Sequence, residues 1–274
     1  NNKYEHYYTG RPNIFILFIA KSLELLENNG ILSFVLPKNF MNCLYYDSLR
    51  KHISTTFKII DIIECYQDKY LETQQDTIVL IIQKQNSVLN NPNYTVNINN
   101  YTIFNTPTIV TQIKACYGNT TTLKNMNFEV KVGNVVWNQV KDKLTNDENE
   151  TRLIYSSDIV NNQLSIKKYK NEAKKNYITK PGKTDLLLVV NRGYGKGDYK
   201  FSYCLIDTDK PYLIENHLIC IKSIEDITKE ELRKKYKKII ESLKSEKTKK
   251  FIELYFGNNA INTTELCEIV PIAL

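Results

Sequence analysis

The 274-residue chain is long enough to form one large domain or two smaller ones. With 42% hydrophobic and 24% charged residues, it has the composition of a folded protein rather than a disordered one. No apolar stretch approaches the roughly 20 residues that span a bilayer, and the first residues, Asn1 to His6, have no apolar core. We therefore expect no membrane association and no signal peptide, and an intracellular location in a bacterial or virus-infected cell. The net charge of +7 suits a polyanionic partner, but it suits a lysine-rich solvated surface equally well.

The six cysteines and three histidines form no recognisable ligand pattern. No two cysteines are spaced as C-x-x-C, and none of the histidines stands near a cysteine at a ligand spacing. A zinc site and a disulfide framework are therefore not expected. We predict reduced thiols and no metal.

The first expected helix runs from Pro12 to Leu26. Its apolar residues Phe15, Ile19 and Leu23 recur at steps of four, which is the spacing of one helix face. Pro12 suits the first turn, and the Asn-Asn-Gly sequence that ends at Gly30 is a helix-stop signal.

The next elements alternate between strands and a helix. We predict strands at 31–36, 59–65 and 77–82 and a helix at 40–53. This order is typical of a doubly wound α/β sheet that ends in a hairpin. Only part of such a sheet is present, so we expect the chain to begin in the middle of a domain.

The residue composition and the pattern of expected elements change near Gly118 to Leu123, where we place a domain boundary between residues 1–120 and 121–274. The second part has a turn and strand at 133–138, strands at 153–159, 186–191, 200–206 and 212–221, and helices at 229–243 and 246–256. This mixture predicts an α+β domain.

Several segments, in a fixed order along nearly the whole chain, carry a family resemblance. They are Arg11 to Phe18, Gly30 to Phe40, Tyr45 to Lys51, Asp76 to Leu80, Gly133 to Gln139, Leu153 to Ile159, Val190 to Gly195, Glu215 to Leu218 and Glu268 to Ile272. Together they resemble the N6-adenine-specific DNA methyltransferases of restriction–modification systems, of the TaqI-like kind, in their C-terminal portion only.

Two features of that family are missing from the sequence. The catalytic Asn-Pro-Pro-Tyr motif is absent, and so is a glycine-rich strand-to-helix turn for S-adenosylmethionine. The one glycine cluster, Gly193 to Gly197, stands between two expected strands and is predicted to be a hairpin loop, because a phosphate-binding turn needs a helix N-terminus. We therefore expect this chain alone to be inactive, as a fragment or as one half of a split enzyme.

The resemblance implies what each part would do. Residues 1–120 would be the C-terminal half of a Rossmann-like methyltransferase domain, and residues 121–274 a target-recognition domain. The assembled enzyme would transfer a methyl group from S-adenosylmethionine to an adenine N6 in double-stranded DNA, without a metal. The missing N-terminal half could be a separate partner chain. The alternatives are a non-catalytic DNA-specificity subunit, an RNA methyltransferase subunit, and a parent chain that also carries a nuclease.

Three residues of the first part are candidates for the methyl-transfer site. Through the resemblance, Tyr70 matches the aromatic residue that stacks on the flipped-out adenine, and Tyr66 is its rival. Phe18 matches the phenylalanine that packs on the adenine of the methyl donor, although it also fits plain core packing with Phe15 and Ile19. Asn13 lies at the head of the same helix and is the second cofactor-binding candidate.

The DNA-contact candidates of the second part lie around one expected strand. Arginine and asparagine can each pair with a base edge through two hydrogen bonds, and tyrosine offers a flat face. The turn that contains Lys180 and Lys183 precedes the expected strand at 186–191. It could lie beside the loop around Arg192 and contact phosphate. The candidates are Asn191, Arg192, Tyr194, Lys196, Lys180 and Lys183.

For three other features, the structural interpretation is the better one. His217 lies in a strand-like run, where a hydrogen-bonded core histidine is more common than a DNA contact. Trp137, the single tryptophan, is expected to pack. The lysines of helix 229–243 fall opposite its apolar residues and are expected to form a solvated face.

Overall fold

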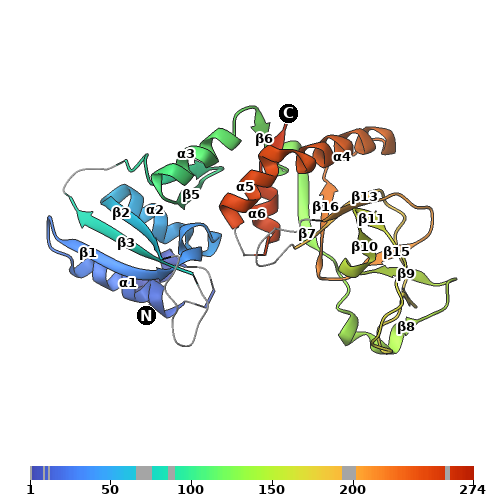
Figure 1. Ribbon diagram of the computed structural model, residues 1–274. Helices are drawn as coiled ribbons and strands as arrows, with labels where there is room; N and C mark the ends of the chain where they lie inside the picture. The colour runs from blue at the N-terminus through green and yellow to red at the C-terminus, as the bar shows by residue number, and fades with distance from the viewer. Residues whose placement is uncertain are drawn as a thin grey trace. The chain divides into compact units, whose positions relative to one another are not determined.

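The computed structural model describes residues 2–8, 10–11, 13–65, 76–85, 90–192, 202–256 and 260–274. The chain divides into two compact units, Asn1–Gly118 and Asn119–Leu274, here called unit 1 and unit 2 (Figure 1). The division falls inside the Gly118 to Leu123 segment, where the sequence pattern indicates a domain boundary. Within the described part of the chain, no helix is both long and apolar enough to cross a membrane.

Unit 1 combines helices with one main sheet, which confirms the expected mixture of helix and strand. Its elements are η1 (Asn2–Tyr7), α1 (Ile14–Leu25), β1 (Ile31–Pro37), η2 (Lys38–Met41), η3 (Leu44–Tyr46), α2 (Asp47–Thr56), β2 (Phe57–Cys65), β3 (Thr77–Lys84), β4 (Thr95–Ile98), β5 (Tyr101–Phe104) and α3 (Pro107–Cys116). The sheet order is β1-β3-β2, and β3 runs antiparallel to both neighbours. β1 and β2 therefore run in the same direction on either side of a reversed strand.

The helix expected at 40–53 is not continuous. Two short 3₁₀ turns precede α2, which begins only at Asp47. The buried Arg50 explains the break, since its Nη1 donates hydrogen bonds to the carbonyl oxygens of Phe40 (2.8 Å) and Cys43 (2.7 Å). These carbonyls therefore have a side-chain donor in place of the backbone N–H groups of a continuous helix.

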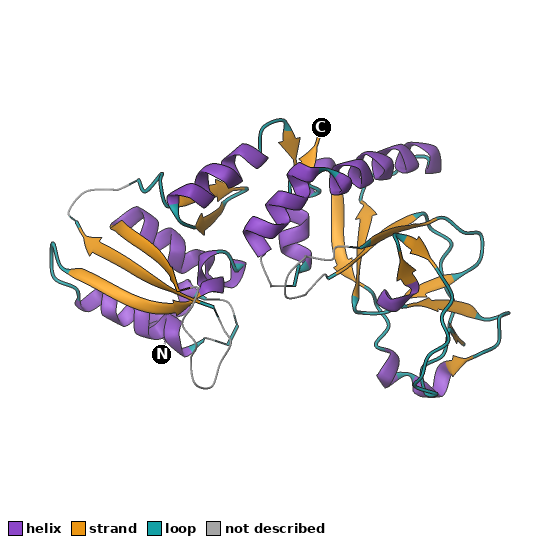
Figure 2. Cartoon of the chain, viewed as in Figure 1, coloured by secondary structure: helices purple, strands orange, loops and turns teal. Residues whose placement is uncertain are grey.

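Helices α1 and α2 cover one face of the main sheet (Figure 2). In register, Leu36, Ile78, Leu80, Ile82 and Ile62 point to this face and are all buried. They pack against Ile16, Ile19 and Leu23 of α1 and against Leu49 and Ile53 of α2. This is the apolar core of unit 1.

Unit 2 is built mainly from two four-stranded sheets and three helices. Its elements are β6 (Thr120–Thr121), η4 (Lys124–Met126), β7 (Phe128–Val132), η5 (Trp137–Gln139), η6 (Lys141–Lys143), β8 (Leu144–Thr145), β9 (Thr151–Ile154), η7 (Ser156–Asp158), β10 (Ile159–Val160), β11 (Gln163–Leu164), β12 (Tyr177–Ile178), β13 (Leu187–Asn191), β14 (Tyr203–Ile206), β15 (Tyr212–Ile214), β16 (Leu218–Ser223), α4 (Lys229–Lys244), α5 (Glu246–Phe256), α6 (Thr263–Glu268) and β17 (Ile272–Ala273). The sheets have the orders β14-β13-β16-β7 and β15-β9-β12-β8. Tyr236 of α4 donates a hydrogen bond to the carbonyl oxygen of Ile221, which fixes α4 to the first sheet.

Two predicted strands of unit 2 are shorter than expected, in each case because an acidic side chain binds the backbone. The strand at 153–159 ends at Ile154, since the Asp158 carboxylate accepts the N–H of Tyr155 at 3.0 Å. The strand at 212–221 is two strands, since Glu215 accepts the N–H of His217 at 3.0 Å and forms a turn. Side-chain hydrogen bonds of this kind compete with ladder pairing.

Candidate functional sites

The C-terminal ends of β1 and β2 meet the start of β3 at one end of the unit 1 sheet, where Pro37 and Cys65 both pair with Thr77. We call this end of the sheet the strand-end edge. Ligands of open α/β sheets bind at such strand ends. Lys38, directly after β1, forms an ion pair with Glu64 of β2, whose side chain is only 5% exposed. Tyr70 and its rival Tyr66 fall outside the described residues, so their stacking role stays a prediction.

Asn39 adds an unusual group to this edge. Its side-chain oxygen Oδ1 is buried and has no hydrogen-bond partner among the described residues. An unpaired buried acceptor costs free energy unless a ligand or water donates to it. The edge is therefore equipped to accept an N–H group from a bound molecule.

The first turn of α1 packs on the segment that follows β1. The ring of Phe15 lies 5.1 Å from that of Tyr46 and 6.2 Å from that of Phe40, and both of these residues belong to that segment. Asn13 is the N-cap of α1, and its Oδ1 accepts the N–H of Phe15 at 3.4 Å. Burial raises the pKa of Tyr46, and a hydrogen bond with the Asn13 side chain partly opposes this effect. Asn13 therefore has a structural role in starting α1.

Phe18 does not belong to the core. Its side chain is 65% exposed, as are its neighbours on the outer side of α1, Ile14 (69%) and Leu25 (67%). The core-packing alternative for Phe18 is therefore wrong, and its ring is free to stack on a ligand or to pack against further polypeptide.

The second face of the unit 1 sheet is apolar and open. Val35, Val79 and Ile63 form one row across the three strands, since Val79 pairs with both of the others. Val35 is 63% exposed and Ile63 is 46% exposed. Ile31 and Ile81 extend this surface, which we call the bare face. β1 is also an edge strand, because among the described strands it pairs only with β3.

In unit 2, four polar residues lie at one end of the β14-β13-β16-β7 sheet, at or just beyond the ends of three strands. Asn191 pairs with Leu218, and Val132 pairs with Ile219. Arg192 therefore lies next to His217, and the turn at Gly133 and Asn134 follows β7 at the same end. We call Asn134, Asn191, Arg192 and His217 the polar sheet end.

His217 is exposed and oriented, contrary to the expectation of a core histidine. Its side chain is 67% exposed, and its Nδ1 lies 2.6 Å from Oε1 of the buried Glu215. The carboxylate holds the imidazole with Nε2 directed away from it, so that Nε2 remains available to a partner. Gly133 allows this packing, because a Cβ there would lie 2.3 Å from the carbonyl oxygen of Glu215.

A half-buried lysine, Lys174, interacts electrostatically with Glu215. The ammonium of Lys174 lies 4.0 Å from the ring centroid of Tyr155 and 4.4 Å from that of Tyr169. Burial lowers the pKa of Lys174, while the carboxylates of Glu215 and Asp158 raise it. The lysine charge thus offsets two buried carboxylates, which would otherwise be costly.

The other predicted DNA contacts are dispersed. Tyr194 and Lys196 fall outside the described residues. Asn191 Oδ1 accepts the N–H of Ser202 at 2.9 Å, and the Arg192 carbonyl accepts the N–H of Ile261 at 2.8 Å. Lys180 and Lys183 precede β13, whereas Arg192 follows it, so the strand separates the two groups rather than placing them side by side.

The remaining features have structural roles. Trp137 packs beside the Val135, Leu153 and Tyr155 cluster. On α4, Lys235 pairs with Glu225 and Arg233 with Asp207, as on an ordinary solvated face. None of the six cysteines forms a disulfide, and the described residues contain no group of histidine, cysteine or acidic side chains able to hold a metal.

Comparisons with known proteins point to one class. Residues 1–71 match the family model of the Eco57I restriction-modification methylases. The chain is 25% identical to the modification methylase CviBIII of Paramecium bursaria Chlorella virus NC1A over 80% of this chain and 54% of that protein. It is 32% identical to a putative type II restriction enzyme and methyltransferase of Methanocaldococcus jannaschii over 27% of this chain and 6% of that protein.

The chain thus spans about half the length of the viral methylase and a small part of the archaeal protein. Among solved structures, it is similar to the type IIG restriction endonuclease BpuSI, with 9% identity and a TM-score of 0.35 over 98% of this chain and 43% of that chain. Such a score is too low to establish a shared fold.

Proposed function

We infer that this chain, a relative of the DNA methylases of restriction–modification systems, supplies part of the catalytic domain and the recognition domain of a site-specific DNA methyltransferase. The methyl acceptor is adenine N6 and the methyl donor is S-adenosylmethionine. Unit 1 contributes to the catalytic domain, and unit 2 recognises double-stranded DNA. The relationship to modification methylases supports the reaction class. Adenine specificity rests on the resemblance of the segments quoted from the sequence.

The observation that carries this proposal is the bare face together with the free edge of β1. An antiparallel sheet can leave one face to solvent, but that face is then normally polar. In unit 1 only one face is covered by described residues, and the other exposes Val35 and Ile63. We propose that further polypeptide, in the same protein or in a partner chain, covers this face, extends the sheet at β1 and completes a Rossmann-like fold.

The described residues fit the adenine end of the methyl donor. Phe18 presents an exposed ring near the start of α1, and such a ring can stack on a purine. Asn13 would act indirectly by starting α1, since its oxygen is already engaged in the cap. When bound, S-adenosylmethionine supplies an electrophilic methyl group.

The strand-end edge would hold the target base. An adenine amino group inside a duplex is out of reach, so the base must leave the stack. Tyr70 is proposed to stack on it, at an energy of about 1–3 kcal/mol. Asn39 Oδ1 is an available acceptor for an N–H of the base or the donor, and the ion pair between Lys38 and Glu64 closes the same edge.

Complementation tests this function. The purified chain is assayed with labelled S-adenosylmethionine and duplex DNA, alone and together with a polypeptide that carries the missing Asn-Pro-Pro-Tyr motif. We expect methylation only in the mixture. Sequence-specific labelling by the chain alone would contradict the proposal. DNA binding that stays specific without methylation in the mixture would favour a non-catalytic specificity subunit.

Matched tyrosine variants test the base-stacking role in the complemented enzyme. Tyr70→Ala should lower the methylation rate and change specific DNA affinity much less, because most DNA contacts lie elsewhere. Tyr66→Ala is the control. A slow Tyr66 variant beside a normal Tyr70 variant would move the stacking role to Tyr66, and two normal variants would remove it from this segment.

A further inference from the structure

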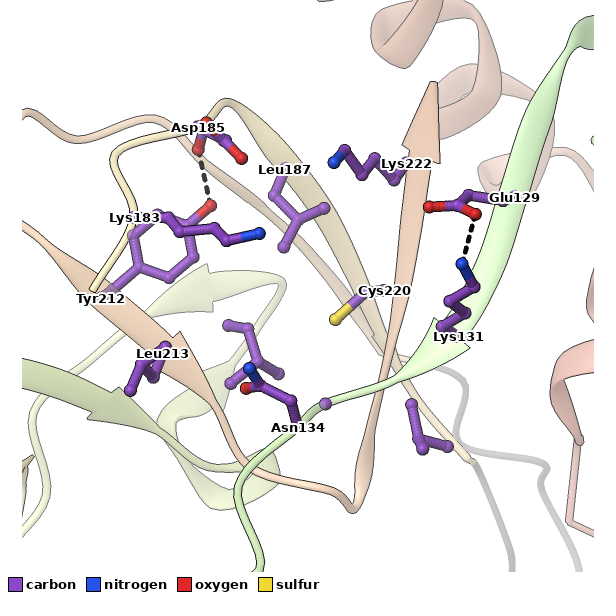
Figure 3. Close-up of a pocket in the computed structure, with 13 residues that line it drawn as sticks. Glu129, Lys131, Asn134, Lys183, Asp185, Leu187, Tyr212, Leu213, Cys220 and Lys222 are labelled. Atoms are coloured by element: carbon purple, nitrogen blue, oxygen red, sulfur yellow. Dashed lines mark hydrogen bonds and ion pairs between the residues drawn. The ribbon is translucent and has the colours of Figure 1, made fainter. Parts of the chain in front are cut away.

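Unit 2 contains a pocket of about 300 Å³ that the methyl-transfer proposal does not use. It opens between the β14-β13-β16-β7 sheet and the strand β15 (Figure 3). Leu187 of β13 and Cys220 of β16 form its floor, and Tyr212 and Leu213 form one wall. Burial raises the pKa of the Cys220 thiol to about 12, so the floor carries no charge near neutral pH.

Two lysines of this pocket have no ion pair among the described residues. Lys131 is neutralised by Glu129, at 2.5 Å. Lys183 and Lys222 form no such ion pair among the described residues, although Glu129 lies on the strand next to Lys222. Figure 3 shows both lysine side chains extending towards the space beside Leu187 from different segments. Two like charges on one concave surface repel each other unless an anion lies between them.

The positions of the two lysines are fixed by the backbone. Lys183 exchanges two backbone hydrogen bonds with Tyr212, at 2.9 and 2.8 Å. The Tyr212 hydroxyl in turn donates to the carbonyl oxygen of Asp185, at 2.5 Å. Lys222 lies within β16, opposite Glu129 of β7. The backbone at both lysines is therefore already held in place before a ligand binds.

The charge of the lining indicates the class of anion. Beside the pair formed by Lys131 and Glu129, the pocket has two ammonium groups and one carboxylate, that of Asp185. The difference is a single positive charge. A phosphodiester carries one negative charge and matches this balance, whereas a phosphate monoester carries nearly two at pH 7 and would meet Asp185 unfavourably.

The pocket also continues to the polar sheet end. Val132, Gly133 and Asn134 line it, and the same turn lies beside His217. We propose that Lys183 and Lys222 bind a phosphodiester of the DNA backbone in this pocket, next to the segment read by the polar sheet end. This inference rests on the recognition role proposed for unit 2.

Salt-dependent DNA binding tests the pocket. Each phosphate contact contributes about 0.9 to the slope of log affinity against log salt. The double variant Lys183→Gln/Lys222→Gln should lower this slope by about one, on specific and unrelated duplexes alike. The control Lys237→Gln/Lys250→Gln removes two exposed lysines of α4 and α5 and should change the slope much less.

Lysine footprinting gives a readout that needs no variant. The chain is acetylated with and without duplex DNA, and modification is measured at each lysine by mass spectrometry. Lys183 and Lys222 should be protected by DNA, while Lys237 and Lys250 should not. Inorganic phosphate and a mononucleotide serve as further arms, and protection by either at low concentration would reassign the pocket to a small phosphate ligand.

The outcomes separate this inference from the proposed function. If the parent chain binds no duplex at low salt, both the recognition role and the phosphodiester site fail. If it binds duplex but neither slope nor footprint distinguishes the pocket lysines from the controls, the pocket assignment alone fails.

Discussion

Asn191 of β13 lies directly opposite Leu218 of β16, so that Arg192 and His217, the next residues outward, are neighbours at one end of the sheet. The two residues are 25 positions apart in the sequence, and different contacts hold them in place. His217 is held by the buried Glu215, whereas Arg192 is exposed and anchored through its backbone carbonyl. An imidazole held in place beside an arginine side chain suits the edge of a base or a phosphate.

The first prediction concerns DNA binding by this pair. Arg192→Ala should weaken specific binding by about 1–3 kcal/mol if the guanidinium pairs with a base edge. His217→Ala should weaken it as well, and the two losses should not be additive, because the side chains are neighbours. Binding isotherms on specific and unrelated duplexes measure both effects.

Arg233→Ala is the control for net charge. Arg233 lies on α4, away from the polar sheet end, and forms an ion pair with Asp207. If Arg192→Ala weakens binding equally on all sequences and lowers the salt slope by about one, Arg192 contacts phosphate only. An Arg192 variant indistinguishable from the Arg233 control would remove it from the interface.

The second prediction compares two adjacent residues on opposite faces of β1. Val35 points to the bare face, while Phe34 packs against the core. Phe34→Ala should destabilise the isolated chain by about 2–3 kcal/mol. Val35→Lys should change its stability by no more than about 1 kcal/mol, yet it should abolish complementation, because a charge would be buried against the added polypeptide.

Denaturant unfolding of the isolated chain and methylation by the complemented enzyme distinguish these effects. A Val35→Lys variant that complements as well as the parent would show that the bare face is not covered in the assembled protein.

The elements that the sequence predicted best are those with a strong periodic pattern. Helices α1, α4 and α5 and the strand β3 agree closely with the expected ranges, because local apolar spacing determines them. The same spacing could not show that Phe18 is exposed. An apolar stripe on a helix has the same spacing whether or not the polypeptide that would cover it is present.

Other features depend on contacts distant in sequence. The break before α2 results from hydrogen bonds of Arg50, and the turn before β16 results from the Glu215 carboxylate. The polar sheet end arises from the register of β13 with β16, which no local pattern specifies. Helices α3 and α6 were not predicted, being short and weakly patterned.

The third prediction concerns the buried Arg50. Its Nε donates to the carbonyl of Thr102 at 2.5 Å, and its Nη1 serves the carbonyls of Phe40 and Cys43. Arg50→Met should destabilise unit 1 by about 3–5 kcal/mol, because it leaves these carbonyls and the nearby Asp47 without their cationic donor.

Lys51→Met is the matched control on the next residue of α2. Lys51 also pairs with Asp47, at 2.7 Å, but its side chain is 46% exposed. Its loss should cost less than about 1 kcal/mol. Hydrogen exchange of α2 measures both variants, and equal protection in the two would contradict a special role for Arg50.

The last prediction concerns pH. His52 of α2 lies among rings, 5.2 Å from the Tyr7 centroid and 5.8 Å from that of Phe57. Burial lowers its pKa below the ordinary value of 6.5, and the nearby His6 lowers it further. Between the two pKa values the unfolded chain binds more protons than the folded one, so stability rises with pH in this window. The contribution of His52 is therefore full above about pH 6.5 and is lost as the pH falls below it.

His52→Phe keeps the ring contacts and removes the proton. Denaturant midpoints should fall from pH 6.5 to 5 more steeply in the parent than in this variant, and the two profiles should run parallel from pH 7 to 8. The Glu24 carboxyl, whose pKa is lowered to about 2 by hydrogen bonds from Lys3 and Tyr4, titrates below this range. The control His6→Gln removes only the weaker cause and should leave most of the slope in place. Parallel profiles of parent and His52→Phe throughout would show that the folded chain does not hold His52 uncharged.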